Sequence, residues 1–283
     1  MLVFRLRKLE MANLAGAVAI TLVLRLPPED VLVRALFAGL LNVLVYLNND
    51  YLDVAIDADA PDKDPAKVAF LRDHMGAAVG AQLVLLLILA AIGWMHSRGL
   101  LVVLALGGGI CWAYSARLKH TALLDVLAMA AWGVVMPLCG APLDSALGIA
   151  LALQLGLMSA VFEPIQTMRD HRADSALGIR TTAVVLGVPS TLRLTRALML
   201  LCALYAALVL HPVAGAIAVV AITMPLRDAE RGPEPVERFW TRIKLVYGLA
   251  WLAACALCYL GEGSHGWLLS VDGAARLPVG AWR

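Results

Sequence analysis

Residues 47–64 contain six aspartates and follow directly on a run of apolar residues. Asn49, Asp53 and Asp57 are four residues apart, which on a helix aligns their side chains along one face. Asp50 lies about 100° further round the same helix. Carboxylates at this spacing repel one another unless a cation lies between them. These hard oxygen donors predict a Mg²⁺ site, and a solvated acidic loop is the alternative.

A second acidic cluster lies in residues 162–182, at the end of another apolar run. Asp170 and Asp174 are again four residues apart, and Glu163 and Thr167 share their helix face. The cations around them are Arg169, Arg172 and Arg180. Two acidic clusters, each with carboxylates one helical turn apart and cations nearby, suit the binding of a diphosphate. Bridging Mg²⁺ would hold it, and Arg and Lys side chains would bind its outer oxygens. A salt-bridged surface loop would have a similar composition.

Between the two clusters, residues 112–125 read WAYSARLKHTALLD. Tyr114, Arg117 and Lys119 bring one hydroxyl and two cations into this segment. Cytoplasmic loops of membrane proteins are rich in Lys and Arg, which would explain the two cations without a role in catalysis or binding. Their position between two acidic clusters favours a role in binding the diphosphate.

The elements that must position these residues are membrane helices. Of the 283 residues, 61% are hydrophobic and 16% are charged, and the mean hydropathy is +0.81. This composition indicates an integral membrane protein in contact with lipid. The net charge of +2 and the absence of Lys/Arg runs exclude nucleic acid as a partner. The five cysteines all lie in apolar runs and are interpreted as packing residues.

Apolar segments about 20 residues long predict an all-α bundle, since none of them alternates as a barrel strand would. The nine predicted spans are roughly 10–26, 31–47, 76–94, 98–114, 122–142, 146–168, 190–210, 212–226 and 242–261.

Most of the 23 Lys and Arg residues fall on one side of this nine-span arrangement. Those on the other side are Arg25, Arg34, Arg98, Arg276 and Arg283. The N-terminus, read as a retained first span, and the charge-rich loops are therefore expected in the cytoplasm. For a bacterial protein the membrane would be the inner membrane.

Three sequence blocks together resemble one known family. NDYLDVAID (49–57) matches the N-D-x-x-D-x-x-x-D signature of the UbiA superfamily of intramembrane prenyltransferases. RDHRADSALGIRTTAVVLG (169–187) is similar to that family's second D-x-x-x-D segment and its Gly-x-[RK]-T stretch, and YSARLKH (114–120) to its Tyr-x-x-x-x-Lys region. The blocks occur in the family's order.

The resemblance implies a single domain over residues 1–283, with about nine transmembrane helices around a central cavity. Two Mg²⁺ ions would bridge the aspartate motifs and an isoprenyl diphosphate. The implied metal or diphosphate ligands are Asn49, Asp53, Asp57, Asp170 and Asp174, with Asp50 beside them. Tyr114, Lys119 and Arg117 would hold the diphosphate, with Arg169, Arg172 and Arg180 close by.

Loss of diphosphate from such a substrate leaves an allylic cation, which an apolar cavity protects from water. Trp112 and Trp132 are candidates for ring faces near this cation, with packing or an interface anchor as the alternative. Glu163 lies one helical turn inside Thr167 and can act as a base towards an acceptor or a carbocation. A structural hydrogen bond, or snorkelling to the rim, is the alternative for Glu163.

The match departs from the family at two places. Many members carry an Arg-Pro pair after the first motif, where this chain has Asp64-Pro65, and Lys63, Lys67 or Arg72 can supply the missing charge. The second motif has Gln166 and Thr167 where relatives often place other polar or charged residues. The predicted function is prenyl transfer to a lipophilic acceptor, for which an aromatic compound is expected. Terpene cyclisation without an acceptor is the alternative, and a transporter is a more remote one.

Overall fold

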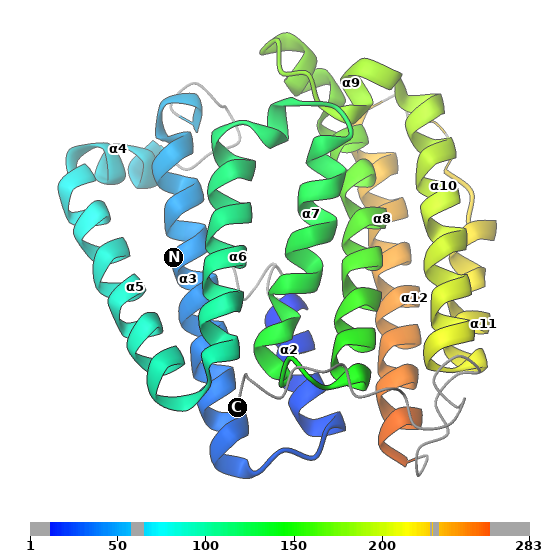
Figure 1. Cartoon of the computed structure of the whole chain (residues 1–283). Helices are drawn as coiled ribbons and strands as arrows, with labels where there is room; N and C mark the ends of the chain where they lie inside the picture. The colour runs from blue at the N-terminus through cyan, green and yellow to red at the C-terminus, as the bar shows by residue number, and fades with distance from the viewer. Residues whose placement is uncertain (1–11, 58–64, 227, 229–231, 261–283) are drawn as a thin grey trace.

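The computed structural model describes residues 12–57, 65–226, 228 and 232–260, and within these ranges the chain is helical and has no strand (Figure 1). The longer helices are α2 (Ala12–Val23), α3 (Pro28–Asp57), α5 (Met75–His96), α6 (Arg98–Ala116), α7 (Leu124–Val135), α8 (Ala146–Ala176), α10 (Val188–Tyr205), α11 (Pro212–Thr223) and α12 (Pro233–Leu260). The shorter elements are α4 (Pro65–Asp73), η1 (Leu118–His120), η2 (Pro137–Gly140), α9 (Thr182–Leu186) and the π-helical η3 (Ala206–Leu210).

Local signals in the sequence set several of the helix ends. Helix α3 begins at Pro28, whose fixed φ suits a first helical residue. Glu29 and Asp30 follow in the first turn, where the helix dipole favours negative charge. Helix α8 is capped by Ser145, whose side chain accepts a hydrogen bond of 3.1 Å from the backbone N–H of Gly148.

Six helical segments in the described part are long and apolar enough to cross a membrane: α3, α5, α6, α8, α10 with η3, and α12. Three apolar segments are shorter, namely α2, α7 with η2, and α11. Each of the nine predicted spans overlaps one of these segments, so the all-helical fold is confirmed and nine crossings stay a prediction. Exposed apolar side chains on α5, such as Leu87 (71%) and Met95 (84%), suit contact with lipid.

Buried apolar residues form two clusters. One joins α8, α10, α11 and α12, and the other joins α3, α5, α6 and α7. Helix α2 contributes to both, through Ile20 to the first and Ala17 to the second. Residues from the two ends of the sequence are thus held in one bundle (Figure 1).

Glycines allow the closest approaches between helices. A Cβ at Gly140 of η2 would lie 2.0 Å from the carbonyl oxygen of Ala17 in α2. A Cβ at Gly156 of α8 would lie 2.2 Å from a methyl group of Val134 in α7 and 2.9 Å from the carbonyl oxygen of Ala130. Small residues at such crossings let membrane helices pack closely by van der Waals contact.

The two aspartate motifs lie on the longest helices. Helix α3 has 30 residues and α8 has 31. A helix of this length spans about 45 Å, compared with roughly 30 Å for the hydrocarbon core of a bilayer. Helices α3 and α8 are therefore long enough for their final turns to extend past the apolar layer, and their carboxylates lie at one end of the bundle.

Candidate active site

The first aspartate motif faces helix α6 and the segment that follows it. The Asn49 side-chain oxygen accepts a hydrogen bond of 2.9 Å from Ser115 Oγ of α6. The Asp53 carboxylate forms an ion pair with Lys119 of η1, and Asp53 is buried. Two of the blocks that were expected to act together are therefore in direct contact.

The remaining predicted ligands of this motif are placed less fully. Asp50 is buried, at 4% exposure, near the end of α3. Asp57 is the last residue of α3, but its side chain lies outside the described part of the chain, as does the whole of Lys63. Next to Lys119, partial burial and then the charge of the lysine lower the pKa of His120 below its ordinary value.

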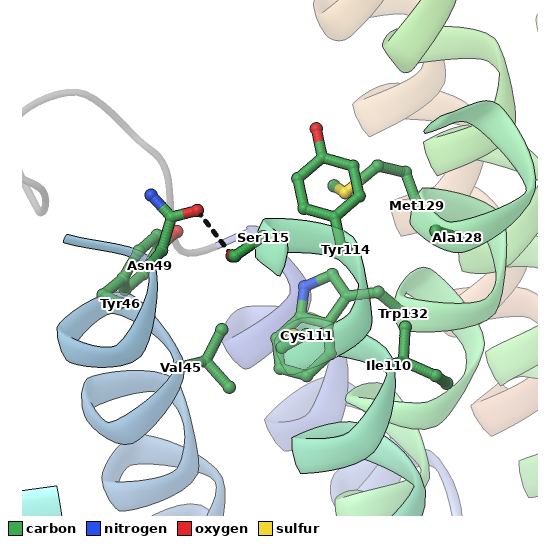
Figure 2. Close-up of a pocket in the computed structure, with 10 residues that line it drawn as sticks. All are labelled: Val45, Tyr46, Asn49, Ile110, Cys111, Tyr114, Ser115, Ala128, Met129 and Trp132. Carbon is green, nitrogen blue, oxygen red and sulfur yellow. Dashed lines mark hydrogen bonds between the residues drawn. The ribbon is translucent and has the colours of Figure 1, made fainter. Parts of the chain in front are cut away.

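An apolar cavity opens beside this motif, between α3, α6 and α7 (Figure 2). Its residues are Val45, Tyr46, Asn49, Ile110, Cys111, Tyr114, Ser115, Ala128, Met129 and Trp132. Its volume is about 170 Å³, and it is partly open to the outside. This volume is smaller than the roughly 300–1,000 Å³ that is usual for small-molecule sites. Polar groups lie at one end of the cavity and apolar side chains along its walls.

A hydrogen-bonded tyrosine–glutamate pair lies beside the cavity. Tyr114 Oη donates a hydrogen bond of 3.0 Å to Glu163 Oε1 of α8, and Glu163 is buried at 6% exposure. Pro164 follows Glu163 inside the helix and has no N–H to donate, so the hydrogen-bond ladder of α8 is interrupted at this level. The structure thus brings together two predicted site residues that are 49 positions apart.

The two tryptophan candidates have different positions. Trp132 of α7 is buried and lines the cavity (Figure 2). Trp112 is 59% exposed and is not part of the cavity wall. Trp112 belongs to a face of α6 that is turned outwards, which favours the alternative role of an interface anchor over a position beside the cation.

The second aspartate motif lies on the last turns of α8. Arg169 Nε and Nη2 donate two hydrogen bonds of 2.8 Å to the two carboxylate oxygens of Asp170. The same guanidinium reaches Glu237 of α12 at 3.4 Å and lies 5.1 Å from the ring centroid of Trp240. Arg169 therefore connects α8 to α12 as well as neutralising Asp170.

Asp174 is held by the segment after α8, since Thr181 Oγ1 donates a hydrogen bond of 3.2 Å to its carboxylate. The other predicted cations of this region, Arg172 and Arg180, are exposed, and so is Arg117 at the end of α6. All three lie at the surface of this end of the bundle.

The segments after α6 and after α8 lie side by side. Thr121 and Arg180 form a parallel backbone bridge, and the Asp125 carboxylate accepts a hydrogen bond of 2.7 Å from the backbone N–H of Thr182. Sequence reasoning missed Ser115, Asp125 and Thr182. The only signal for Asp125 was an acid at the start of an apolar run, which also reads as an ordinary helix start.

The family model of the UbiA prenyltransferase family matches residues 12–228. The match covers most of the chain and all three sequence blocks. The chain belongs to the UbiA prenyltransferase family. Membership, together with the long apolar helices, makes it an integral membrane protein. No curated protein matches the chain by sequence.

Solved structures of UbiA proteins share the fold at low sequence identity. A digeranylgeranylglyceryl phosphate synthase superposes with a TM-score of 0.71 at 13% identity, over 88% of this chain and 94% of that one. A UbiA homologue from Archaeoglobus fulgidus bound to DMAPP and Mg²⁺ gives 0.58 at 13% identity, over 89% and 97%. The same homologue bound to GPP and Mg²⁺ gives 0.58 at 14%, over 88% and 95%.

The donor set of this UbiA-family chain fits Mg²⁺ held jointly with a phosphate. Within the described ranges no three His, Cys, Asp or Glu side chains converge as a ready-made ion cage. Mg²⁺ is usually bound through one or two carboxylates plus substrate phosphate oxygens and water, so separate donors on α3 and α8 suffice. Asp53 forms an ion pair with Lys119, and Asp170 with Arg169. Each carboxylate therefore lies where a cation is stabilised.

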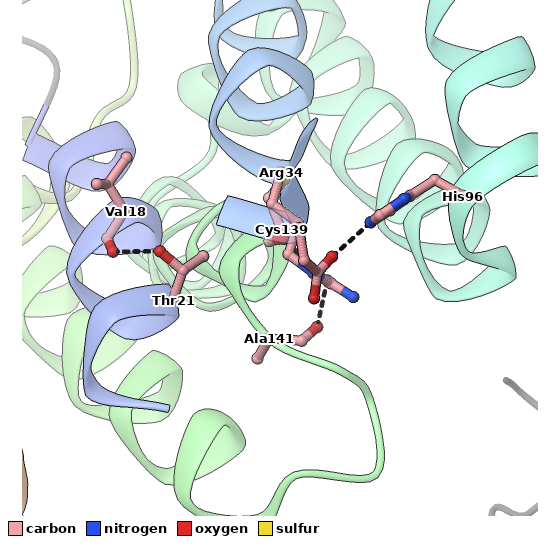
Figure 3. A network of polar contacts seen from close by, with 7 residues as sticks. Val18, Thr21, Arg34, His96, Cys139 and Ala141 are labelled. Atoms are coloured by element: carbon pink, nitrogen blue, oxygen red, sulfur yellow. Dashed lines mark hydrogen bonds and ion pairs between the residues drawn. The ribbon is translucent and has the colours of Figure 1, made fainter. Parts of the chain in front are cut away.

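At the other end of this UbiA-family bundle a polar network joins α3 to η2 (Figure 3). Arg34, at 5% exposure, pairs with Asp30 at 2.9 Å and donates to the carbonyl oxygens of Cys139 and Ala141 at 3.1 and 3.0 Å. His96 of α5 contacts the same carboxylate of Asp30. The network satisfies carbonyl groups that the break between α7 and α8 leaves without helical partners.

Proposed function

We propose that this protein is a Mg²⁺-dependent intramembrane prenyltransferase that ionises an isoprenyl diphosphate and transfers the prenyl group to a lipophilic acceptor. The proposal places the site on the cytoplasmic side, where the charge-rich loops are expected. The observation that carries it is the contact between Asp53 and Lys119, one helical turn along α3 from Asn49 in the wall of an apolar cavity. An ionic head group and an apolar chain would each find a matching surface there.

In this proposal the diphosphate lies between the ends of α3 and α8. The residues that would hold Mg²⁺ are Asn49, Asp50, Asp53, Asp57, Asp170 and Asp174. Bound Mg²⁺ would neutralise charge on the departing diphosphate. Lys119 and Arg180, on the two paired segments, would bind phosphate oxygens, with Arg117, Arg172 and Lys63 around them. Preorganised cations act most strongly on the charge that develops as the allylic C–O bond breaks.

The prenyl chain would occupy the cavity below this polar end. Val45, Ile110 and Met129 give it an apolar wall that excludes water from the allylic cation. Trp132 supplies an aromatic face, whose quadrupole stabilises a nearby cation. The acceptor would approach the same cavity and supply the electron pair for the new bond to carbon.

A second candidate function is cyclisation of the prenyl diphosphate without an acceptor. The hydrogen-bonded pair of Tyr114 and Glu163 favours it, because a buried carboxylate beside the cavity can remove a proton from a carbocation. Both reactions begin with the same ionisation and differ only in what the cation does next.

The first test is incubation of the purified protein in detergent with geranyl, farnesyl and geranylgeranyl diphosphate and Mg²⁺, without an acceptor. Release of diphosphate with a cyclic or rearranged hydrocarbon supports the cyclase. Binding of the substrate with little product supports the transferase, and candidate acceptors are then added. If no prenyl diphosphate binds, the proposed function is wrong.

Asp53→Asn should lower turnover at least about 100-fold, because the amide cannot supply the charge that a divalent cation requires. The matched control is Asp73→Asn at the end of α4, where the Asp73 side chain is 68% exposed. Initial rates of both variants are compared with the wild type, and their melting temperatures show whether they are folded. A folded Asp53→Asn protein with wild-type turnover would contradict the assignment of Asp53.

A further inference from the structure

The carboxylate of Asp125 joins two segments that are distant in the sequence. Its Oδ1 accepts hydrogen bonds from Thr182 Oγ1 at 2.5 Å and from the backbone N–H of Val126 at 2.8 Å. Its Oδ2 accepts the backbone N–H of Thr182 at 2.7 Å. Asp125 and Thr182 are both fully buried, at 0% exposure. We call these two residues and their hydrogen bonds the Asp125–Thr182 latch.

Placing a carboxylate here is costly unless its hydrogen bonds are made. Among the described residues no Lys or Arg lies within ion-pair distance of Asp125, so hydrogen bonds and the start of helix α7 must stabilise its charge. Removing one partner of a buried charged group leaves it unsatisfied, which makes such contacts geometrically demanding. The latch therefore fixes the two segments in one relative position.

The backbone beside the latch is strained. Leu123, immediately before α7, has a φ of 68°, in the left-handed region that a leucine rarely adopts. Its backbone N–H donates to Thr182 Oγ1 at 2.7 Å, so the hydroxyl that binds Asp125 also holds this residue. A conformation of this kind is energetically unfavourable and persists only where neighbouring contacts enforce it.

Each of the two latched segments carries groups of the proposed site. The segment before α7 carries Lys119, which pairs with Asp53 of the first motif. The segment after α8 carries Arg180, and the next residue, Thr181, binds Asp174 of the second motif. Thr121 and Arg180 pair through their backbones between these points. A continuous set of contacts thus runs from one aspartate helix to the other, and the latch lies at its centre.

We propose that Asp125 and Thr182 are positioning residues that set the separation between Lys119 and Arg180, the cations of the diphosphate site. The inference rests on the proposed function, since it assigns these two cations to the diphosphate. Neither Asp125 nor Thr182 lines the cavity, so we expect loss of the latch to weaken the binding of the head group and to leave the binding of the prenyl chain unchanged.

The test compares Thr182→Val, which removes the hydroxyl at nearly constant volume, with Thr182→Ser, which keeps it. Thr195→Val is the matched control, because Thr195 is also fully buried and its hydroxyl donates to a backbone carbonyl of α10 at 2.8 Å. Dissociation constants are measured for farnesyl thiolodiphosphate with Mg²⁺ and for farnesol, which has the same chain without the diphosphate. Melting temperatures are recorded for all variants.

The expected result is that Thr182→Val weakens thiolodiphosphate binding about tenfold or more and leaves farnesol binding unchanged, while Thr182→Ser restores the wild-type value. Equal losses of affinity for both ligands would overturn the inference. A loss of thiolodiphosphate affinity no greater than that of Thr195→Val would also overturn it. If Thr182→Val does not fold, Asp125→Asn is measured in the same way. A wild-type protein that binds farnesol but not the thiolodiphosphate would instead overturn the proposed function.

Discussion

At the scale of single residues, the charged groups of the site occur as specific pairs. Asp53 forms an ion pair with Lys119, and Asp170 accepts hydrogen bonds from Nε and Nη2 of Arg169. Such pairing offsets the repulsion that neighbouring carboxylates would otherwise exert in an apolar protein. Glu163 differs from them, because its described hydrogen-bond partner is the neutral hydroxyl of Tyr114.

We expect Glu163→Gln to reduce product formation about 100-fold while prenyl diphosphate binding is unchanged, because the amide still accepts the Tyr114 hydrogen bond but takes no proton. Products are quantified by gas chromatography, and binding is measured separately. Glu234→Gln serves as the control, since the Glu234 side chain is 85% exposed on α12. A wild-type rate in Glu163→Gln would leave Glu163 with a structural role only.

At the scale of helices, close packing decides where the site residues lie. Helix α7 and its continuation η2 contact both α2 and α8, and glycines stand at the tightest points of these contacts. Arg34 adds polar contacts from α3 to the carbonyl groups of Cys139 and Ala141. Trp132 and Asp125, at different levels of α7, are therefore positioned by contacts outside the cavity.

Gly140→Ala should lower the melting temperature by roughly 5–10 °C, because the new methyl group meets the Ala17 backbone at 2.0 Å and backbone cannot give way easily. Gly108→Ala on α6 is the matched control, since nothing lies within 4 Å of its added methyl group. Alanine there should be neutral or slightly stabilising. Thermal unfolding in one detergent measures both, and equal melting temperatures would show that η2 and α2 can separate at little cost.

At the scale of the whole molecule, the bundle has two chemically different ends. One end carries both aspartate motifs and the paired segments with Lys119 and Arg180. The other end carries the network of Asp30, Arg34 and His96. An odd number of membrane crossings would place the two chain termini on opposite sides.

This orientation can be tested by cysteine labelling, because the five native cysteines are all buried. Asp73→Cys, at the end of α4, should react with a membrane-impermeant maleimide only in inside-out vesicles. Asp144→Cys, between η2 and α8, should react only in right-side-out vesicles. Labelling of both positions from the same side would contradict the expected topology. Detergent-solubilised protein, in which both positions should react, is the control.

Much of the candidate site could be predicted from sequence because it depends on local spacing. Carboxylates four residues apart share a helix face wherever that helix lies, so the motifs of α3 and α8 were readable from the chain. Burial of an acid in an apolar segment likewise pointed to Glu163. The all-helical class followed from the length and composition of the apolar runs.

Tertiary structure alone decided which residues meet. Helical period does not say which face of α6 turns inwards, and so Trp112 was expected beside the cation although it is exposed. The contacts of Ser115 with Asn49, and of Asp125 with Thr182, join positions 66 and 57 residues apart. Such pairs depend on how helices pack and cross, and packing is set by the shapes of many side chains together. Residue types and spacing therefore determined the chemistry that this chain can perform, and packing determined its geometry.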